Sequence, residues 1–401
     1  MLDNIILILI LIFLFFTEKG KLLKKSVALY FVIMFPNRSW HLPKWLSPKI
    51  KIEEYSFKID NRQILPDFYR PDNNKQYPGM IVFAPLAKEG KREPLVVNFM
   101  KGLVGLGFTV MVPFWPARSV GTIYESDSND LVECINWFSK YKYLNADPIG
   151  IAAVSYGSGP AIIACSDLQV QGKIRYLMSI SGYIDLLSVA RLVITKHFCY
   201  KNISGTVSPD PYARYILFKN AGNWCNNKKD TKIFYQLAEN FFTKQNPESE
   251  IADRRNDLTK SGKKIFDWVT SKNSKEFDTG FTNMPEKIKK YYSSLSLTDE
   301  IIKSINFPML ILHSTNDRLI PYTESIKLFD KIENKKESSL VLISAFDHTV
   351  PVPATFKNIW TIYLPNLARI VKFIFRMLEI SIKKKKRMNP PCGKNTGYPL
   401  F

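Results

Sequence analysis

The stretch GIAAVSYGSGP (residues 150–160) places a serine between an apolar run and a cluster of glycines. The run IGIAAV (149–154) is short and apolar and ends at turn residues, which predicts a buried β-strand. The glycines predict a sharp turn, and the small residues after them predict a helix that begins near Pro160. The stretch therefore indicates a strand, a turn and a helix, with Ser155 at the turn.

Short apolar runs alternate with helix-like segments from about residue 50 onward, which is typical of a βαβ series. Strands are expected at 51–59, 64–71 (ILPDFYRP, its hairpin partner), 79–86, 108–114, 149–154, 174–180, 308–314 and 338–345. Helices are expected at 94–106, 127–141, 158–168 and 322–332. Since the later strands are almost continuously apolar, they predict a mostly parallel twisted sheet flanked by helices, an α/β fold.

The series is interrupted once. Between Asp185 and about Ile305 the sequence shows no clear strand, only loop residues and helix-like pieces such as IFYQLAENFF and KKIFDWV. A loop of that length without secondary structure is improbable. We therefore expect a helical cap insertion at 186–305, between two parts of the core at 50–185 and 306–382.

Ser155 stands in the pattern A-x-S-x-G. A nucleophile elbow needs small residues two positions before and two after the serine, because its backbone is strained and the strand and helix pass closely. Ala153 and Gly157 meet this requirement. A nucleophilic serine also needs a base to take its proton and an acid to hold that base.

The candidate base is one of four histidines, His41, His197, His313 and His348. His41 precedes the sheet, His197 falls in the insertion, and His313 lies inside a strand, where a core role is expected. Only His348, in SAFDHTVP, follows the last strand on a polar turn. We therefore predict that His348 is the general base.

The candidate acid should follow the preceding strand. Asp317, in PMLILHSTNDRLIP, does so. Asp185 follows strand 174–180 and stays open as an alternative, whereas Asp347 beside His348 is interpreted as a turn residue. Position favours Asp317.

An oxyanion hole requires two backbone N–H groups. One comes from the residue after the nucleophile, here Tyr156, and one from the loop that follows strand 79–86. In FAPLAKEG the expected second donor is Leu86.

Together these residues resemble the α/β-hydrolase superfamily over about residues 50–380, through AVSYGSG, STNDRLIP and AFDHT in this order. Ser-Tyr-Gly at the turn and ILPDFYRP are most similar to the dienelactone-hydrolase and prolyl-oligopeptidase-like branches. Two features depart from them. The oxyanion loop reads Ala84-Pro85-Leu86 instead of the familiar His-Gly, and a dienelactone hydrolase would carry Cys at Ser155. The resemblance implies an α/β-hydrolase fold but no particular substrate.

The expected function is that of a serine hydrolase that cleaves a carboxylic ester or another acyl bond. Aromatic residues in the insertion suggest an apolar small-molecule substrate, and esters are favoured over peptides because no propeller domain is evident. A peptidase or acyltransferase with the same triad, and a non-catalytic scaffold tethered to a membrane, remain alternatives. The five cysteines and four histidines show no metal-ligand spacing, so neither metal nor cofactor is implied.

A membrane segment is expected at residues 1–36. The run IILILILIFLFF (5–16) would cover about 18 Å as a helix, short of the roughly 30 Å hydrocarbon core. It lacks the basic start and the cleavage site of a signal peptide, which favours a retained anchor. Lysines follow the run, and the positive-inside rule then predicts that the rest of the chain lies in the cytoplasm. After a break at Glu18–Lys25, a second apolar stretch at 27–36 could lie in the membrane interface or pack on the protein.

The formal net charge of +20 is spread over the chain, with one dense block at Lys383–Arg387 in a basic tail, 383–401. The sequence contains no zinc-finger, RNP-like or helix-turn-helix pattern, so nucleic-acid binding is not expected. An anionic membrane surface and plain solvent are both compatible with the basic block. The preceding helix, 367–382, could lie on a membrane or pack on the sheet.

Overall fold

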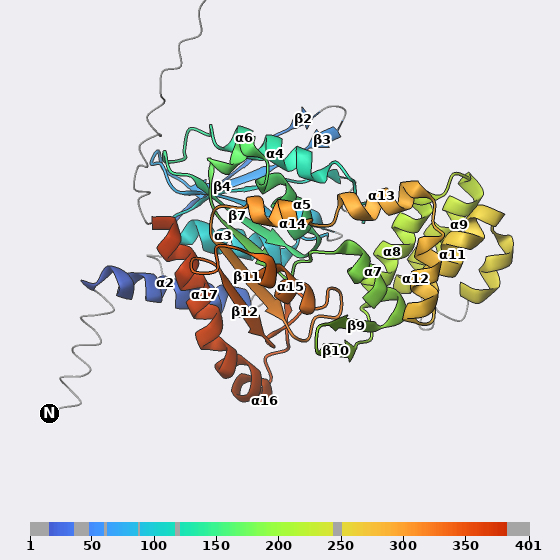
Figure 1. Cartoon of the computed structure of the whole chain (residues 1–401). Helices are drawn as coiled ribbons and strands as arrows, with labels where there is room; N and C mark the ends of the chain where they lie inside the picture. Colours follow the sequence, from blue (N-terminus) through green and yellow to red (C-terminus); the bar gives the residue numbers. More distant parts are fainter. Residues whose placement is uncertain are drawn as a thin grey trace, which may run out of the picture.

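The computed structural model describes residues 16–35, 48–59, 62–86, 89–116, 121–243 and 251–382. They form a central eight-stranded sheet with helices on both faces and a mainly helical unit beside it (Figure 1). The strand order is β1-β4-β6-β5-β7-β8-β11-β12. The predicted α/β class, with a mostly parallel sheet and flanking helices, is confirmed.

The sheet is parallel from β6 to β12 and antiparallel at the edge formed by β1 and β4. Its strands are β1 (Ile50–Glu54), β4 (Asp67–Pro71), β6 (Thr109–Val112), β5 (Gly79–Phe83), β7 (Ile149–Val154), β8 (Ile174–Ile180), β11 (Met309–Ser314) and β12 (Ser339–Ile343). The predicted bounds of β7 and β8 match the structure. The two expected N-terminal strands are each divided, because β2 (Phe57–Ile59) and β3 (Arg62–Ile64) pair in a separate hairpin.

Side chains alternate between the two faces of a strand. One face carries Met80 and Val82 and packs under α2 (Glu18–Met34), α3 (Pro94–Gly105) and α17 (Leu364–Ile382). The other face carries Ile81 and Phe83. It packs under α4 (Asp127–Phe138), α5 (Ser158–Cys165), α6 (Leu168–Gln171), α14 (Asp299–Ser304) and α15 (Thr323–Lys331). The sheet is therefore the middle layer of three.

Helix α2 spans both the polar interruption at Glu18–Lys25 and most of the second apolar stretch, since residues 18–34 form one continuous helix. Its second half packs on α3 and α17, where Leu29, Tyr30 and Met34 are buried, so the second apolar stretch lies on the protein. Within the described part of the chain, no helix combines the length and apolar character needed to cross a membrane. The expected segment 1–36 is thus not confirmed, and its residues 1–15 and 36 lie outside the described residues.

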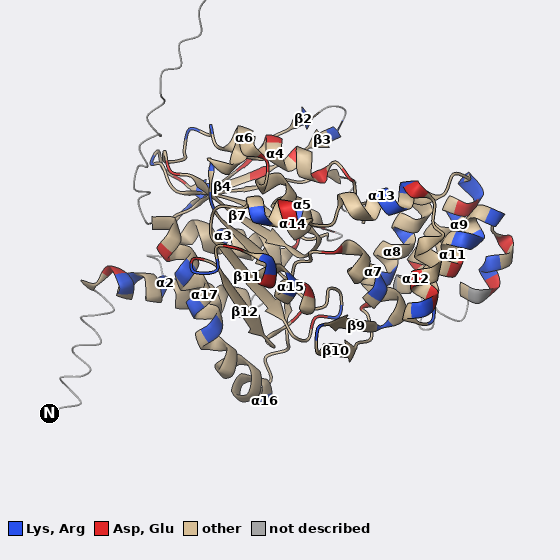
Figure 2. Ribbon diagram, in the orientation of Figure 1, with Lys and Arg blue, Asp and Glu red and all other residues tan. Residues whose placement is uncertain are grey.

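Helix α17 contains the predicted helix 367–382 and packs its apolar side on the sheet and α2, the second of the two alternatives left open for it. Figure 2 shows Lys and Arg interspersed with Asp and Glu along the described helices, strands and loops. The basic tail 383–401 lies outside the described residues.

The inserted residues build a unit with its own aromatic core, in which Phe218, Trp224 and Trp268 are buried. Its helices are α7 (Leu186–Thr195), α8 (Pro211–Trp224), α9 (Lys228–Thr243), the 3-10 helix η5 (Ala252–Asp257), α11 (Lys260–Val269), α12 (Ser274–Thr282) and α13 (Glu286–Ser294). A hairpin, β9 (His197–Tyr200) and β10 (Ile203–Thr206), was not expected there. The remaining short elements are η2 (Gly90–Arg92), η4 (Ser155–Gly157), β13 (Phe346–Asp347), β14 (Val350–Pro351), α16 (Phe356–Asn358) and η6 (Ile359–Tyr363).

Candidate active site

Ser155 lies at a strained turn between β7 and α5. Its φ of 58° is in the left-handed region that a residue with a Cβ rarely adopts. Ser155 is the first residue of the turn η4, and α5 begins at Ser158, the first residue of the predicted helix 158–168. A Cβ on Gly157 would lie 2.5 Å from Phe83 Cδ1 and 3.0 Å from the Phe83 carbonyl oxygen, so this position requires glycine. The turn therefore has the steric features expected of a nucleophile elbow.

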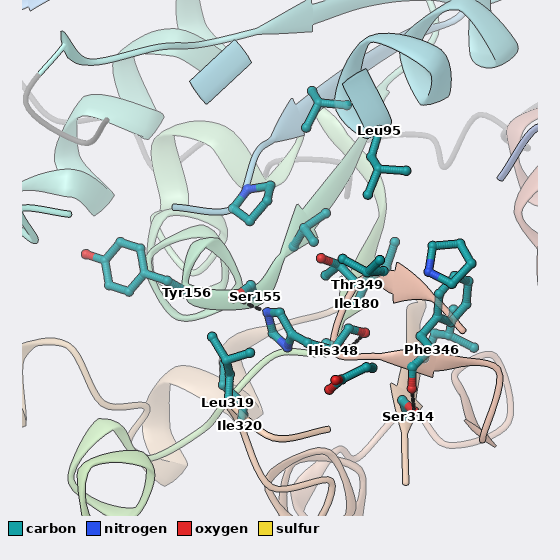
Figure 3. A pocket seen from close by; sticks show the side chains of 18 of the residues that line it. Leu95, Ser155, Tyr156, Ile180, Ser314, Leu319, Ile320, Phe346, His348 and Thr349 are labelled. Carbon is teal, nitrogen blue, oxygen red and sulfur yellow. Dashed lines mark hydrogen bonds between the residues drawn. The ribbon is translucent and has the colours of Figure 1, made fainter. Parts of the chain in front are cut away.

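His348 approaches Ser155 from the turn of the hairpin β13–β14. Its Nε2 lies 2.7 Å from Ser155 Oγ (Figure 3). The backbone of His348 also has a positive φ, 56°, and its carbonyl oxygen accepts a hydrogen bond from Ser181 Oγ at 3.1 Å. The ring is buried. The tight turn and the hydrogen bond from Ser181 hold the backbone of His348, and this positions the imidazole over the serine.

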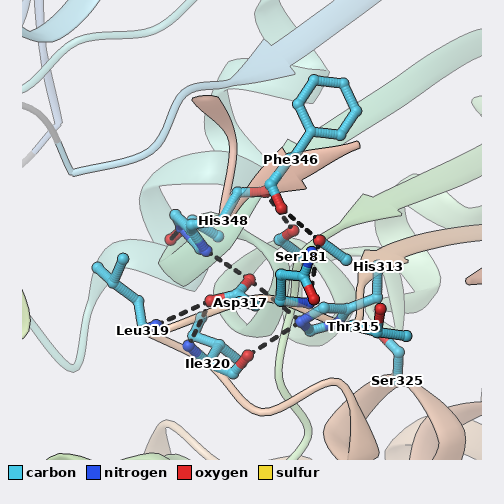
Figure 4. A network of polar contacts seen from close by, with 12 residues as sticks. Ser181, His313, Thr315, Asp317, Leu319, Ile320, Ser325, Phe346 and His348 are labelled. Atoms are coloured by element: carbon cyan, nitrogen blue, oxygen red, sulfur yellow. Dashed lines mark hydrogen bonds and ion pairs between the residues drawn. The ribbon is translucent and has the colours of Figure 1, made fainter. Parts of the chain in front are cut away.

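Asp317, the predicted acid, contacts His348 on the side away from Ser155. Its Oδ2 lies 2.7 Å from His348 Nδ1, while Oδ1 accepts hydrogen bonds from the backbone N–H groups of Leu319 (2.8 Å) and Ile320 (2.9 Å) (Figure 4). Both carboxylate oxygens are therefore occupied, and the side chain has one orientation.

The electrostatics of Asp317 favour its charged form. Burial alone raises the pKa of this carboxyl, but the adjacent His348 and His313 outweigh burial and hold the pKa well below its ordinary value. An ionised Asp317 accepts the Nδ1 proton of His348. That tautomer leaves Nε2 free to accept a proton from Ser155.

His313 is buried, as its position in a strand predicted, but it also belongs to this network. Its Nε2 lies 3.0 Å from the Ile320 carbonyl oxygen and 3.2 Å from Asp317 Oδ2, and its Nδ1 lies 2.6 Å from Ser325 Oγ. Because the carbonyl oxygen can only accept, Nε2 carries a proton, and the serine hydroxyl can serve Nδ1 as a hydrogen-bond partner. The sequence signal for this role was the position of His313 four residues before Asp317, at the end of β11.

The alternative acids have other partners. Asp185 caps α7, where its Oδ1 accepts from the Leu187 N–H at 2.9 Å. Asp347 forms an ion pair with Arg318 at 2.6 Å. Of the other histidines, His197 lies in β9 of the insertion, and His41 lies outside the described residues.

Tyr156 and Leu86, the predicted oxyanion donors, both line the cavity that contains Ser155. The Tyr156 hydroxyl donates to Asp127 Oδ2 at 2.9 Å, which points its ring away from the base (Figure 3). The Leu86 carbonyl oxygen accepts from the Tyr212 hydroxyl of α8 at 2.9 Å, so the insertion helps to fix this loop. The use of the two N–H groups as oxyanion donors stays a prediction.

The cavity has a volume of about 910 Å³ and is lined mainly by apolar side chains. Ser155 and His348 open into it, and residues of the insertion, including Tyr212 and Ile216, form part of its wall. No group of three or more His, Cys, Asp or Glu side chains suited to a metal ion occurs in the described part of the chain.

Comparison with known proteins gives no matching family model and no matching curated protein. Among solved structures, the chain is similar to Est1E from Butyrivibrio proteoclasticus, solved with ferulic acid bound (TM-score 0.46, 12% identity, 82% of this chain and 100% of that chain). It is also similar to an acylaminoacyl peptidase from Pyrococcus horikoshii (TM-score 0.47, 13% identity, 85% and 43%) and to a 2,6-dihydroxy-pseudo-oxynicotine hydrolase (TM-score 0.43, 14% identity, 80% and 67%).

These similarities concern the fold and carry no substrate to this chain. The fold itself is evident from its own geometry. A serine stands at a strained turn between a central parallel strand and its helix, and the acid and the histidine follow later in the chain, after β11 and β12. This arrangement is that of the α/β-hydrolase superfamily, and the chain has the α/β-hydrolase fold.

Proposed function

We propose that the protein is a serine hydrolase that cleaves a carboxylic ester through an acyl-enzyme. The observation that carries the proposal is the continuous contact from Ser155 Oγ to His348 Nε2 (2.7 Å) and from His348 Nδ1 to Asp317 Oδ2 (2.7 Å). The serine is held on a strained turn and faces a cavity. A purely structural role would not require a buried hydroxyl, imidazole and carboxylate in this order.

In the first half of the reaction, Ser155 Oγ attacks the carbonyl carbon of the ester while its proton passes to His348 Nε2. The carbonyl electron pair moves to oxygen, where the N–H groups of Tyr156 and Leu86 would stabilise the negative charge. As the carbonyl re-forms, the bond to the alcohol breaks, and His348 gives its proton to the departing alkoxide. Asp317 stabilises the imidazolium that forms between these transfers.

In the second half, water takes the place of the alcohol. His348 accepts a proton from the water as its oxygen attacks the acyl carbon. The tetrahedral intermediate then expels Ser155 Oγ, which recovers its proton from His348. The products are a carboxylic acid and an alcohol, and the enzyme returns to its initial state without any cofactor.

A fluorophosphonate probe tests the proposal, because it reacts only with an activated serine. The intact protein and a Ser166→Ala control should label, since Ser166 Oγ only donates to the Ile163 carbonyl after α5. Ser155→Ala and His348→Ala should not label. If the folded protein stays unlabelled beside a known serine hydrolase, the non-catalytic scaffold takes precedence.

The choice of ester over peptide rests on the apolar cavity wall, and it is tested by comparing p-nitrophenyl esters with aminoacyl anilides. Faster turnover of the anilides would indicate a peptidase. Membrane association through residues 5–16, with the body in the cytoplasm, also stays a prediction. Recovery of the protein in the soluble fraction after gentle lysis without detergent would contradict it.

A further inference from the structure

The cavity does not end at the catalytic serine but continues along one face of the sheet. Beyond Ser155 its wall includes Val82, Met178 and Leu312 of the sheet, and also Phe99 of α3 and Ile374 of α17. Helix α2 contributes Leu29, Val32 and Ile33 to the wall of this inner part. The space therefore lies where the core between the sheet and these three helices would otherwise be filled by side chains.

On the basis of the hydrolase function proposed above, we infer that this inner part binds the acyl chain of the substrate. The substrate would then be an ester of a long-chain fatty acid. The acyl carbonyl would lie at Ser155. The hydrocarbon chain would extend between the sheet and α3, α17 and α2.

The distribution of polar groups supports this orientation. Four charged side chains besides His348 line the cavity. Arg318 pairs with Asp347 and Asp210 next to the triad, and Glu93 lies at the N-cap of α3. The wall contributed by α2 and α17 contains only apolar residues. An apolar chain gains free energy by entering such a space, whereas a polar or charged group would lose its hydration without finding partners.

The size of the cavity supports a long chain. Its volume of about 910 Å³ is near the upper end of the roughly 300–1,000 Å³ found for small-molecule sites. A water molecule occupies about 30 Å³ in the liquid, and a methylene group is of comparable size, so a chain of about 16 carbons fits with room for the ester. An acetyl group would leave most of the cavity empty.

The chain-length dependence of hydrolysis tests the inference. With the full chain and p-nitrophenyl acetate, butyrate, octanoate and laurate, each kept below its micelle concentration, kcat/KM should rise by roughly tenfold for every two carbons added. The rate measured with Ser155→Ala gives the background for each ester.

Two substitutions on α2 locate the chain. Val32 lines the cavity and Val27, on the same helix and also half-buried, does not. Val32→Phe should lower kcat/KM for laurate at least tenfold and leave acetate within twofold. Val27→Phe adds the same volume outside the cavity and should change neither. Melting curves of both variants establish that they are folded.

The outcomes separate the two proposals. If Ser155-dependent hydrolysis falls steadily from butyrate to laurate, the protein is a hydrolase but the long-chain inference is overturned. If no ester is cleaved and no fluorophosphonate label appears, the hydrolase proposal fails. Binding of fluorescent cis-parinaric acid then tests whether the inner cavity holds an acyl chain. If Val32→Phe weakens this binding and Val27→Phe does not, the result supports the acyl-chain site. If the protein does not bind the probe, the acyl-chain site is overturned.

Discussion

His313 Nε2 lies 3.2 Å from Asp317 Oδ2, the same oxygen that contacts His348 Nδ1. Two imidazoles thus converge on one carboxylate oxygen, while two backbone N–H groups occupy the other (Figure 4). Only His348 reaches the serine. His313 can therefore affect the reaction only through Asp317, as a positioning residue.

Replacing His313 should slow the chemical step without weakening binding of the substrate. A hydrogen bond to a charged group contributes about 1.5 kcal/mol, so His313→Ala should lower kcat about tenfold and leave KM for a short ester unchanged. His313→Gln, which restores a side-chain N–H, should recover part of the loss. Steady-state kinetics of folded protein provide the measurement. An unchanged kcat in His313→Ala would mean that the backbone N–H groups alone position Asp317.

The identity of the acid can be tested with three isosteric substitutions. Asp317→Asn should lower kcat by about a thousandfold or more, since an amide no longer stabilises the imidazolium and favours the wrong tautomer of His348. Asp185→Asn should stay within about threefold of the wild type, because Asp185 caps a helix and Asn is an equally good cap. Asp347→Asn should also retain activity. A loss confined to Asp185→Asn would overturn the assignment of Asp317.

Gly157 tests whether the turn, and not only the triad, is needed. Gly157→Ala places a Cβ against the Phe83 ring and carbonyl, so we expect a loss of roughly 1–3 kcal/mol in the free energy of unfolding and a slower fluorophosphonate reaction. Gly172→Ala is the matched control, because a Cβ there meets nothing within 4 Å. Thermal unfolding and labelling rates report the two effects. Equal behaviour of both variants would show that the turn adapts to a larger residue.

Sequence reasoning predicted the central part of the fold well, for a physical reason. Strands such as β7 and β8 are buried on both faces, so they read as unbroken apolar runs with clear ends. The elbow was equally visible, since its steric requirements fall on neighbouring residues. The structure then brings Ser155, His348 and Asp317 together from three separate loops.

Other features depend on packing between distant segments and left no local signal. The sequence did not predict that the polar residues Glu18–Lys25 share one helix with the apolar stretch after them. In the structure, Lys25 Nζ of this helix donates to the Leu106 carbonyl. The short hairpin β9–β10 lacks the alternation that marks longer strands. The inner cavity lies between side chains of α2, α3, α17 and the sheet. Because these segments are far apart in the chain, no single stretch of sequence predicts it.

Glu53, on the edge strand β1, is a carboxylate whose surroundings in the folded protein strongly favour its charged form. Its Oε2 accepts from the hydroxyls of Tyr141 (2.6 Å) and Tyr55 (3.0 Å), and its Oε1 accepts from Arg70 Nη2 (2.9 Å). Burial raises the pKa of Glu53, but these hydrogen bonds outweigh burial and lower the pKa to about 2. The charged form of Glu53 is therefore more stable, relative to the neutral form, in the folded protein than in the unfolded chain.

The sign of the pH dependence follows from this lowered pKa. Stabilisation by Glu53 is complete above the unfolded pKa of 4.5 and is lost as the pH falls toward 2. Glu53→Gln should lower the free energy of unfolding by about 2 kcal/mol at pH 7, and the difference from the wild type should shrink steadily below pH 4.5. Urea unfolding at a series of pH values measures this. Glu54→Gln, at an exposed position of the same strand, should stay within about 0.5 kcal/mol throughout. If the Glu53→Gln difference is independent of pH, the side chain stabilises the edge of the sheet by packing, since an ionisation effect must disappear once the wild-type carboxylate is protonated.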